Sequence, residues 1–255
     1  MKNVKRSALR GLLVVLSASL TATLGCSPVP ELGEATAEDA YTVGVDALER
    51  EDYLLAIEAF TRVTMVSPLG DWADDALVGL GDAHRAIGEY AIAEEEYRRL
   101  VSDYPRSPLV PEAEYKVGLS YYEQSLPAEL DQSMTRSAID QFDRFVEAYP
   151  SSDLVPDARQ RITELRARLA SKEFAAAMLY VKLRDPKAAR LYLEAVVADY
   201  PDTDWARRAL LEIARSHASE GATALADQAY DRVMELYPGT EEAASARAEK
   251  GGEAP

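Results

Sequence analysis

Small, aromatic and aliphatic residues recur at fixed distances before five prolines, which are Pro68, Pro105, Pro150, Pro201 and Pro238. Alanine stands twelve residues before each proline, at Ala56, Ala93, Ala138, Ala189 and Ala226. A large apolar residue stands eight residues before each, at Phe60, Tyr97, Phe142, Leu193 and Tyr230, and another stands five residues before, at Val63, Leu100, Phe145, Val196 and Val233. Steps of three and four residues place all three on one stripe of a helix, and a proline ends such a helix. The pattern therefore predicts a helix before each proline.

A second periodic segment follows each proline. Alanine stands eight residues after all five, at Ala76, Ala113, Ala158, Ala209 and Ala246. Thirteen residues after the first four prolines stand Gly81, Gly118, Thr163 and Ala214. The segments 107–113 and 152–158 both begin with serine and carry an early proline and an acidic residue, which favour a helix start. The sequence therefore predicts two helices per unit, which approach each other closely at the small residues.

The spacings between the prolines are 37, 45, 51 and 37 residues, which we interpret as a 37-residue unit with insertions in the third and fourth copies. The order of small residue, ring, aliphatic residue and proline at this period resembles the tetratricopeptide repeat. The resemblance spans about residues 37–238 and implies an all-α tetratricopeptide-repeat solenoid of five repeats, about ten helices, wound as a right-handed superhelix. Each unit leaves an apolar face exposed until its neighbours stack on it.

The two insertions differ in kind. The third unit gains a polar loop near 125–133, whereas the fourth keeps its apolar stripe without a break, which predicts one helix over 154–183. At 1.5 Å per residue this helix is about 45 Å long, so its partner helix cannot cover it completely. Its projecting end should contact another protein, and we assign partner docking to Tyr180, Leu183 and Arg184.

The N-terminus predicts export and a lipid anchor. Residues 1–10 carry four basic and no acidic side chains, and the apolar run 12–24 is too short and too rich in Ser and Thr to span a bilayer, so residues 1–25 read as a lipoprotein signal peptide. It ends at Gly25 and Cys26, which is the single cysteine of the chain. Cys26 is the predicted lipidation site, although Thr23 departs from the leucine usual in such signals.

The remaining chain divides into four predicted segments. We expect residues 26–36 to form a flexible tether, 37–150 to hold repeats 1–3 with a candidate binding groove, 151–240 to hold repeats 4–5 with the docking residues, and 241–255 to form a capping helix remnant with a disordered tail. Without residues 1–25 the chain has 24 basic and 44 acidic residues, a formal charge of −20. Nucleic acid is therefore excluded as a partner, because its binding depends on neutralising phosphates with Lys and Arg.

The chemistry of an enzyme is missing from the sequence. The two histidines, His84 and His217, occupy the same position of two repeats, sixteen residues after a proline, which favours a packing role. No HExxH, glycine-rich phosphate loop, G-x-S-x-G or Cys–His pair occurs. Acidic runs such as 94–96 are typical of a solvated helix face. We therefore expect no catalytic residue, no metal, no cofactor and no small-molecule substrate.

A candidate binding face follows from the repeat register. In tetratricopeptide arrays the first helix of each unit lines the concave face, through residues three before, one after and four after the close-packed small residue. For the first three units, on Gly44, Gly81 and Gly118, this implies a largely apolar groove of Tyr41, Val45, Leu48, Val78, Asp82, Arg85, Tyr115, Leu119 and Tyr122. The same positions in the last two units are more polar: Gln160, Glu164, Ala167, Leu211, Arg215 and Ala218. An alternative is that these side chains contact neighbouring helices or the tether, in which case they pack within the protein and form no binding groove.

Together these features resemble one family. The signal ending in cysteine, the short tether, five repeats and an overlong fourth unit are similar to the BamD (YfiO) family of outer-membrane protein assembly lipoproteins. The segments that carry the likeness are 47–63, 140–150, 158–173 and 188–203. The resemblance implies a periplasmic, lipid-anchored subunit of the machinery that inserts β-barrel proteins into the outer membrane.

The same resemblance implies two partners. The C-terminal repeats would dock on the periplasmic domains of a BamA-like barrel subunit, and the N-terminal groove would recognise the aromatic-ended last strand of unfolded outer-membrane proteins. An alternative is an envelope adaptor of the Tol-Pal or peptidoglycan-coordination type built on the same repeats. Such adaptors usually lack the lipidated cysteine and often carry an N-terminal coiled coil, which this sequence does not predict.

Overall fold

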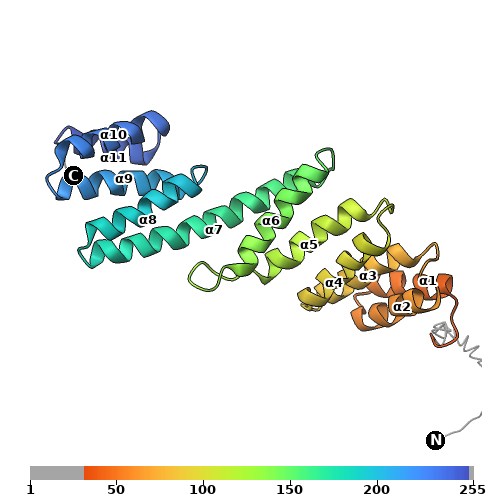
Figure 1. Cartoon of the computed structure of the whole chain (residues 1–255). Helices are drawn as coiled ribbons and strands as arrows, with labels where there is room; N and C mark the ends of the chain where they lie inside the picture. The colour runs from red at the N-terminus through yellow and green to blue at the C-terminus, as the bar shows by residue number, and fades with distance from the viewer. Residues whose placement is uncertain (1–31, 253–255) are drawn as a thin grey trace, which may run out of the picture.

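The computed structural model describes residues 32–252, which form eleven helices and no strand. The helices are α1 (Ala37–Glu49), α2 (Tyr53–Val66), α3 (Ala73–Ala86), α4 (Tyr90–Asp103), α5 (Val110–Gln124), α6 (Ser133–Ala148), α7 (Val155–Lys182), α8 (Pro186–Asp199), α9 (Asp204–Ser219), α10 (Thr223–Leu236) and α11 (Glu241–Lys250). Each helix packs on the next in the chain, and the array extends from α1 at one end to α11 at the other (Figure 1). The predicted all-α repeat fold is confirmed, with five helix pairs followed by α11.

The helices of the first three pairs meet where a glycine faces an aromatic ring. A Cβ atom added to Gly81 would lie 2.2 Å from Tyr97 Cε1, and one added to Gly118 would lie 2.6 Å from Phe142 Cε1. Phe60 is enclosed on two sides, because Cβ atoms at Gly44 and Gly79 would come within 2.6 and 2.5 Å of its ring. Only a residue without a side chain fits at these contacts, as the sequence pattern predicts.

The fourth unit pairs differently from the sequence prediction. Thr163, the predicted small residue of this unit, is exposed. Ala177 lies fourteen residues later and is fully buried in the same apolar cluster as Leu193 of α8. The inserted residues lengthen α7 itself, so α8 packs back on the second half of α7, and the prediction of Thr163 at the close approach is wrong.

Three apolar clusters run along the array, and α5 and α7 connect them. The first cluster joins α1–α5, the second joins α5, α6 and the start of α7, and the third joins the end of α7 to α8–α11. Within α7, Leu165 belongs to the second cluster and Ala170 to the third. α7 is therefore the structural link between the two halves of the protein, and its 28 residues confirm the predicted long helix.

The loop 125–132 between α5 and α6 is fixed by two polar side chains. Gln132 is 2% exposed, and its amide nitrogen donates to backbone carbonyls of the loop, including that of Pro127 at 2.8 Å. Lys172, in the middle of α7, donates to the carbonyls of Leu130 at 2.7 Å and Ala128 at 3.2 Å. The loop is therefore held against α7 near the point where the second and third clusters meet.

The ends of the described chain are packed. Leu32 and Ala35, in the predicted tether, are buried in the first cluster. α11 begins with Thr240 capping the amide of Ala243 and buries Ala246. Within residues 32–252 no helix combines the length and apolarity needed to cross a membrane. The predicted signal peptide, Cys26 and the last three residues lie outside the described part of the chain.

Candidate protein-binding faces

The nine residues of the predicted client groove lie on α1, α3 and α5, and we call them the N-terminal face. All are partly exposed except Tyr115, which is 7% exposed. On α1 the ring of Tyr41 stacks on Trp72 with the centroids 4.7 Å apart, and it lies tilted against Phe60 with the centroids 5.9 Å apart. Val45, Leu48 and Val78 also pack against the first apolar cluster, so much of this face supports the fold.

The charged residues of the N-terminal face already have partners. Asp82 accepts hydrogen bonds from Tyr97 Oη and Lys116 Nζ, both at 2.7 Å. Arg85 donates to Glu123 at 2.8 Å. Burial and the Asp82 carboxylate raise the pKa of Tyr97, so its hydroxyl remains a donor. These contacts connect α3 to α5 through side chains.

Tyr115 and Tyr122 connect α5 to α7. The ring of Tyr115 packs on Phe142 and Phe145, and its hydroxyl donates to Asp157, which Arg161 also contacts at 2.6 Å. Burial raises the pKa of Tyr115 to about 12. Burial opposes ionisation of Asp157, but the hydrogen bonds from Tyr115 and Arg161 outweigh it and lower its pKa.

Tyr122 is more accessible and donates to Glu164 at 2.9 Å. The guanidinium of Arg161 lies 4.7 Å from the centre of its ring. The structure therefore separates two predicted groove residues by role, because Tyr115 belongs to the core whereas Tyr122 lies at the surface.

The three predicted docking residues lie at the turn from α7 to α8. The ring of Tyr180 stacks on Tyr192 of α8, with the centroids 5.3 Å apart and the planes at 16°. Leu183 is 64% exposed, and Arg184 adopts a φ of 59°, which turns the chain back after α7. Leu179, Val181 and Leu191 are also exposed here, so the turn presents an apolar surface.

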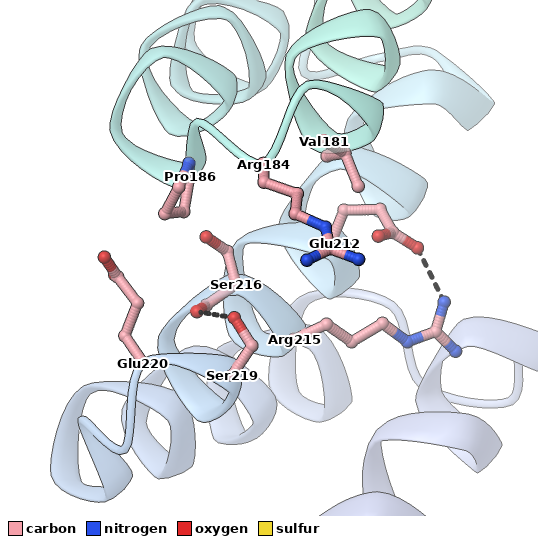
Figure 2. A pocket seen from close by; sticks show the side chains of 8 residues that line it. All are labelled: Val181, Arg184, Pro186, Glu212, Arg215, Ser216, Ser219 and Glu220. Carbon is pink, nitrogen blue, oxygen red and sulfur yellow. Dashed lines mark hydrogen bonds and ion pairs between the residues drawn. The ribbon is translucent and has the colours of Figure 1, made fainter.

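Arg184 also lines the first of two adjoining cavities, which together form what we call the C-terminal groove. The first cavity encloses about 440 Å³ between the α7–α8 turn and α9 (Figure 2). The second encloses about 330 Å³ between α7, α9 and α11. Both include Glu212 and Arg215 of α9 in their walls. The first is lined by Val181, Arg184, Pro186, Glu212, Arg215, Ser216, Ser219 and Glu220, and the second by Phe174, Arg208, Leu211, Glu212, Arg215, Glu241, Glu242 and Ser245.

Arg215 forms the fixed centre of the C-terminal groove. It donates to Glu249 of α11 through Nε at 3.0 Å and Nη2 at 2.6 Å, and to Glu212 at 2.6 Å through Nη1. The hydrogen bonds from Arg215 lower the pKa of Glu249. Burial and the nearby Glu249 raise the pKa of Tyr230, which donates to the same carboxylate, to about 12. The network holds α9 and α11 together beneath the groove.

Sequence reasoning found Leu211, Arg215 and Arg184 but missed Phe174 and Val181. Phe174 stands three residues before Ala177, and Val181 stands four residues after it. These are the groove positions of the repeat when they are counted from Ala177, but not when they are counted from Thr163. The signal was present in the apolar stripe of α7, but its use requires knowing where α8 folds back. His84 contacts Glu89 at 2.7 Å, and among the described residues no three His, Cys, Asp or Glu side chains are grouped to hold a metal ion.

One family profile matches most of this chain, and two similar proteins carry the same name. The sequence profile of the YfiO family, described as outer membrane lipoprotein, matches residues 33–246. The outer membrane protein assembly factor BamD of Caulobacter vibrioides is 28% identical over 210 residues, which cover 82% of this chain and 69% of that protein. The factor of the same name from Rickettsia prowazekii is 25% identical over 199 residues, covering 77% and 79%.

Among solved structures, the TPR2AB-domain:pHSP90 complex of yeast Sti1 is 16% identical and covers 84% of this chain and 82% of its own, with a TM-score of 0.49. The profile match extends from the segment before α1 into α11 and so includes all five helix pairs. This protein therefore belongs to the YfiO (BamD) family of outer membrane lipoproteins.

Proposed function

We propose that this protein is a non-enzymatic, lipid-anchored scaffold of outer-membrane protein assembly, held at the periplasmic face of the outer membrane. The observation that carries the proposal is the family match over residues 33–246, together with two relatives named as outer membrane protein assembly factors. A solenoid of helix pairs suits this role because it offers long side-chain surfaces to other proteins. We assign the N-terminal face to unfolded clients and the C-terminal half to the periplasmic domains of a BamA-like barrel subunit.

The two halves differ in ways that support this division. They have separate apolar cores joined through α7. The N-terminal face is aromatic and aliphatic, whereas the C-terminal half offers the exposed apolar turn at Leu183 and a groove with charges at its walls. Two surfaces of different chemistry on one scaffold can hold two partners at once.

Affinity purification of the intact protein from detergent-solubilised membranes tests the proposed docking. We expect a large β-barrel subunit to be recovered with the wild-type protein and to be reduced several-fold by Leu183→Ser. Leu225→Ser is the matched control, because Leu225 is 51% exposed on α10, which packs on α9 and α11. Failure to recover any β-barrel subunit with the wild-type protein would overturn the proposed function.

Client binding is tested by a peptide with the aromatic-ended last strand of an outer-membrane protein. Leu48→Ser with Leu119→Ser should weaken its binding, because both leucines are partly exposed on the N-terminal face. Leu54→Ser is the control, since Leu54 is 73% exposed on α2 outside this face. Tyr115 is unsuitable because its substitution would disturb the core. Equal affinity of the double variant and the control would refute the client assignment.

Anchoring is tested separately by Cys26→Ser. A chain with several acyl groups gains about 0.8 kcal/mol of membrane affinity per buried CH₂, so the wild-type protein should remain in the membrane fraction after a salt wash. The variant should move to the soluble periplasmic fraction. A variant that stays with the membrane would contradict the lipid anchor.

A further inference from the structure

The C-terminal groove has the dimensions of a short peptide site. Its wall on α9 runs from Arg208 through Leu211 and Arg215 to Ser219, all on one face at steps of three and four residues. Eleven residues of helix span about 17 Å. An extended chain rises about 3.3 Å per residue, so about five residues fill this length.

Apolar side chains line the groove at both ends. Phe174 of α7 and Leu211 of α9 lie in the second cavity, and the Phe174 ring is held in place by Trp205, with centroids 5.3 Å apart. Val181 and Pro186 lie in the first cavity, where Val181 is 40% exposed. Leu211 is 5% exposed, so Phe174 and Val181 offer the exposed apolar surface that a partner segment would cover.

Most charges along the groove are neutralised by one another. Arg215 is paired with Glu212 and Glu249, as described above. Glu242 contacts Arg207 at 2.9 Å and Arg208 at 3.6 Å. Glu220 is paired with Arg190. These pairs leave the groove, apart from its unpaired charges, without a strong preference for either sign.

The two ends of the groove differ. Within residues 32–252, Arg184 at the α7–α8 turn forms no ion pair, and neither does Glu241 at the start of α11. Figure 2 shows the Arg184 side chain projecting from the turn toward α9, and Arg184 and Glu212 line the same cavity. The groove therefore has a positive end at Arg184 and a negative end at Glu241, with apolar side chains near each end and the paired Arg215 and Glu212 between them.

We propose that the C-terminal groove binds a partner segment of about five residues with an acidic side chain at the Arg184 end, a basic side chain at the Glu241 end and apolar side chains between them. The inference rests on the proposed assignment of the C-terminal half to docking, and it names the chemistry of the segment that docks there. Charge complementarity at the two ends fixes the direction in which the segment lies.

Fluorescently labelled peptides with blocked ends provide the test. Three share a Leu-Ala-Leu centre and differ in their ends, which are Glu and Lys, Glu and Gln, or Gln and Lys. Binding to the full-length protein is measured by fluorescence anisotropy at 50 mM salt, where screening is weaker than at physiological salt. The peptide with both charges should bind most tightly.

Charge-reversal variants identify the two ends. Arg184→Glu should weaken the peptide with Glu and Gln ends about three- to tenfold and strengthen the peptide with Gln and Lys ends, because each partly exposed pair contributes at most about 1 kcal/mol and reversal adds repulsion. Glu241→Lys should do the opposite. Arg232→Glu, on α10 outside the groove, should change neither.

A structural effect would weaken all three peptides alike, so the exchange of preference between Arg184→Glu and Glu241→Lys is the supporting result. Absence of binding up to millimolar peptide, or equal effects of both variants on all peptides, would overturn the inference. Concentration-dependent dimers abolished by Arg184→Glu would also overturn it, by showing that a second copy occupies the groove. Recovery of the β-barrel subunit without peptide discrimination would leave the proposed function standing and reject this inference alone.

Discussion

The contact of Gly118 with Phe142 allows a direct test of how the helix pairs are held together. A Cβ atom at position 118 would lie 2.6 Å from Phe142 Cε1 and 2.7 Å from Cδ1, closer than carbon atoms approach in proteins. Phe142 is fully buried, and its ring is 5.7 Å from that of Tyr115, so it cannot move aside freely. In the fourth unit the buried pair is Ala177 and Leu193 instead. Where alanine replaces glycine on the first helix, leucine thus replaces the larger phenylalanine on the second.

The magnitudes follow from these contacts. Overpacking costs about 1–3 kcal/mol, and alanine is favoured over glycine in a helix by about 0.8–1.0 kcal/mol, so Gly118→Ala should lower the free energy of unfolding by up to about 2 kcal/mol. Phe142→Leu leaves a small cavity and should cost about 1–2 kcal/mol. The double variant recreates the pairing of the fourth unit. It should lose less than the sum of the two, with a coupling of about 1–2 kcal/mol.

Urea unfolding followed by circular dichroism at 222 nm measures the free energy of unfolding of the wild type, the two single variants and the double variant. Repeat arrays can unfold unit by unit. The dependence of the free energy of unfolding on urea concentration must therefore be the same in all four proteins before their free energies are compared. Gly33→Ala is the control, because a Cβ atom there meets nothing within 4 Å. Losses that add within about 0.3 kcal/mol would refute the reasoning, because independent effects would mean that the glycine and the ring do not constrain each other.

Three further predictions concern the polar contacts around α7. Gln132→Leu should destabilise the protein by about 1–3 kcal/mol in thermal unfolding, because the loop carbonyls lose their buried donor, and an unchanged midpoint would contradict this. Lys172→Met should increase amide hydrogen exchange in loop 125–132 while leaving α1–α4 unchanged, and equal protection in both proteins would show that Lys172 does not hold the loop. Hydrogen bonds from Arg166 lower the pKa of Asp202 below its usual 3.8, so the stability from this pair is present above pH 3.8 and is lost as the pH falls further through the lowered pKa. The thermal midpoint of Arg166→Met should therefore fall less steeply below pH 3.8 than that of the wild-type protein.

The local features of the fold were predictable from the sequence, because each depends on residues close together in the chain. Four helices end two residues before Pro105, Pro150, Pro201 and Pro238, with a tyrosine C-cap directly before each proline, which cannot continue a helix. Gly81 and Gly118 mark close approaches because the ring eight residues before the next proline requires the space. The uninterrupted stripe of α7 predicted its length nearly to the residue.

The candidate faces were only partly predictable. Helical periodicity placed the nine residues of the N-terminal face on one side of α1, α3 and α5, but it gave no signal that Tyr115 would be enclosed by Phe142 and Phe145. Enclosure depends on how far apart neighbouring units lie. That distance is set by the packing of α6 between α5 and α7, which no spacing within α5 reports.

The sequence by itself determined where helices begin and end and which stripe of each is apolar, since these follow from interactions three or four residues apart. Only the tertiary structure decided that Ala177 rather than Thr163 meets α8, and so brought Phe174 and Val181 to the C-terminal groove. The apolar stripe of a long helix looks alike at every turn, so it does not indicate which turns the next helix contacts. The position at which its partner folds back depends on contacts between residues distant in the chain, and these alone select which turns of α7 face the groove.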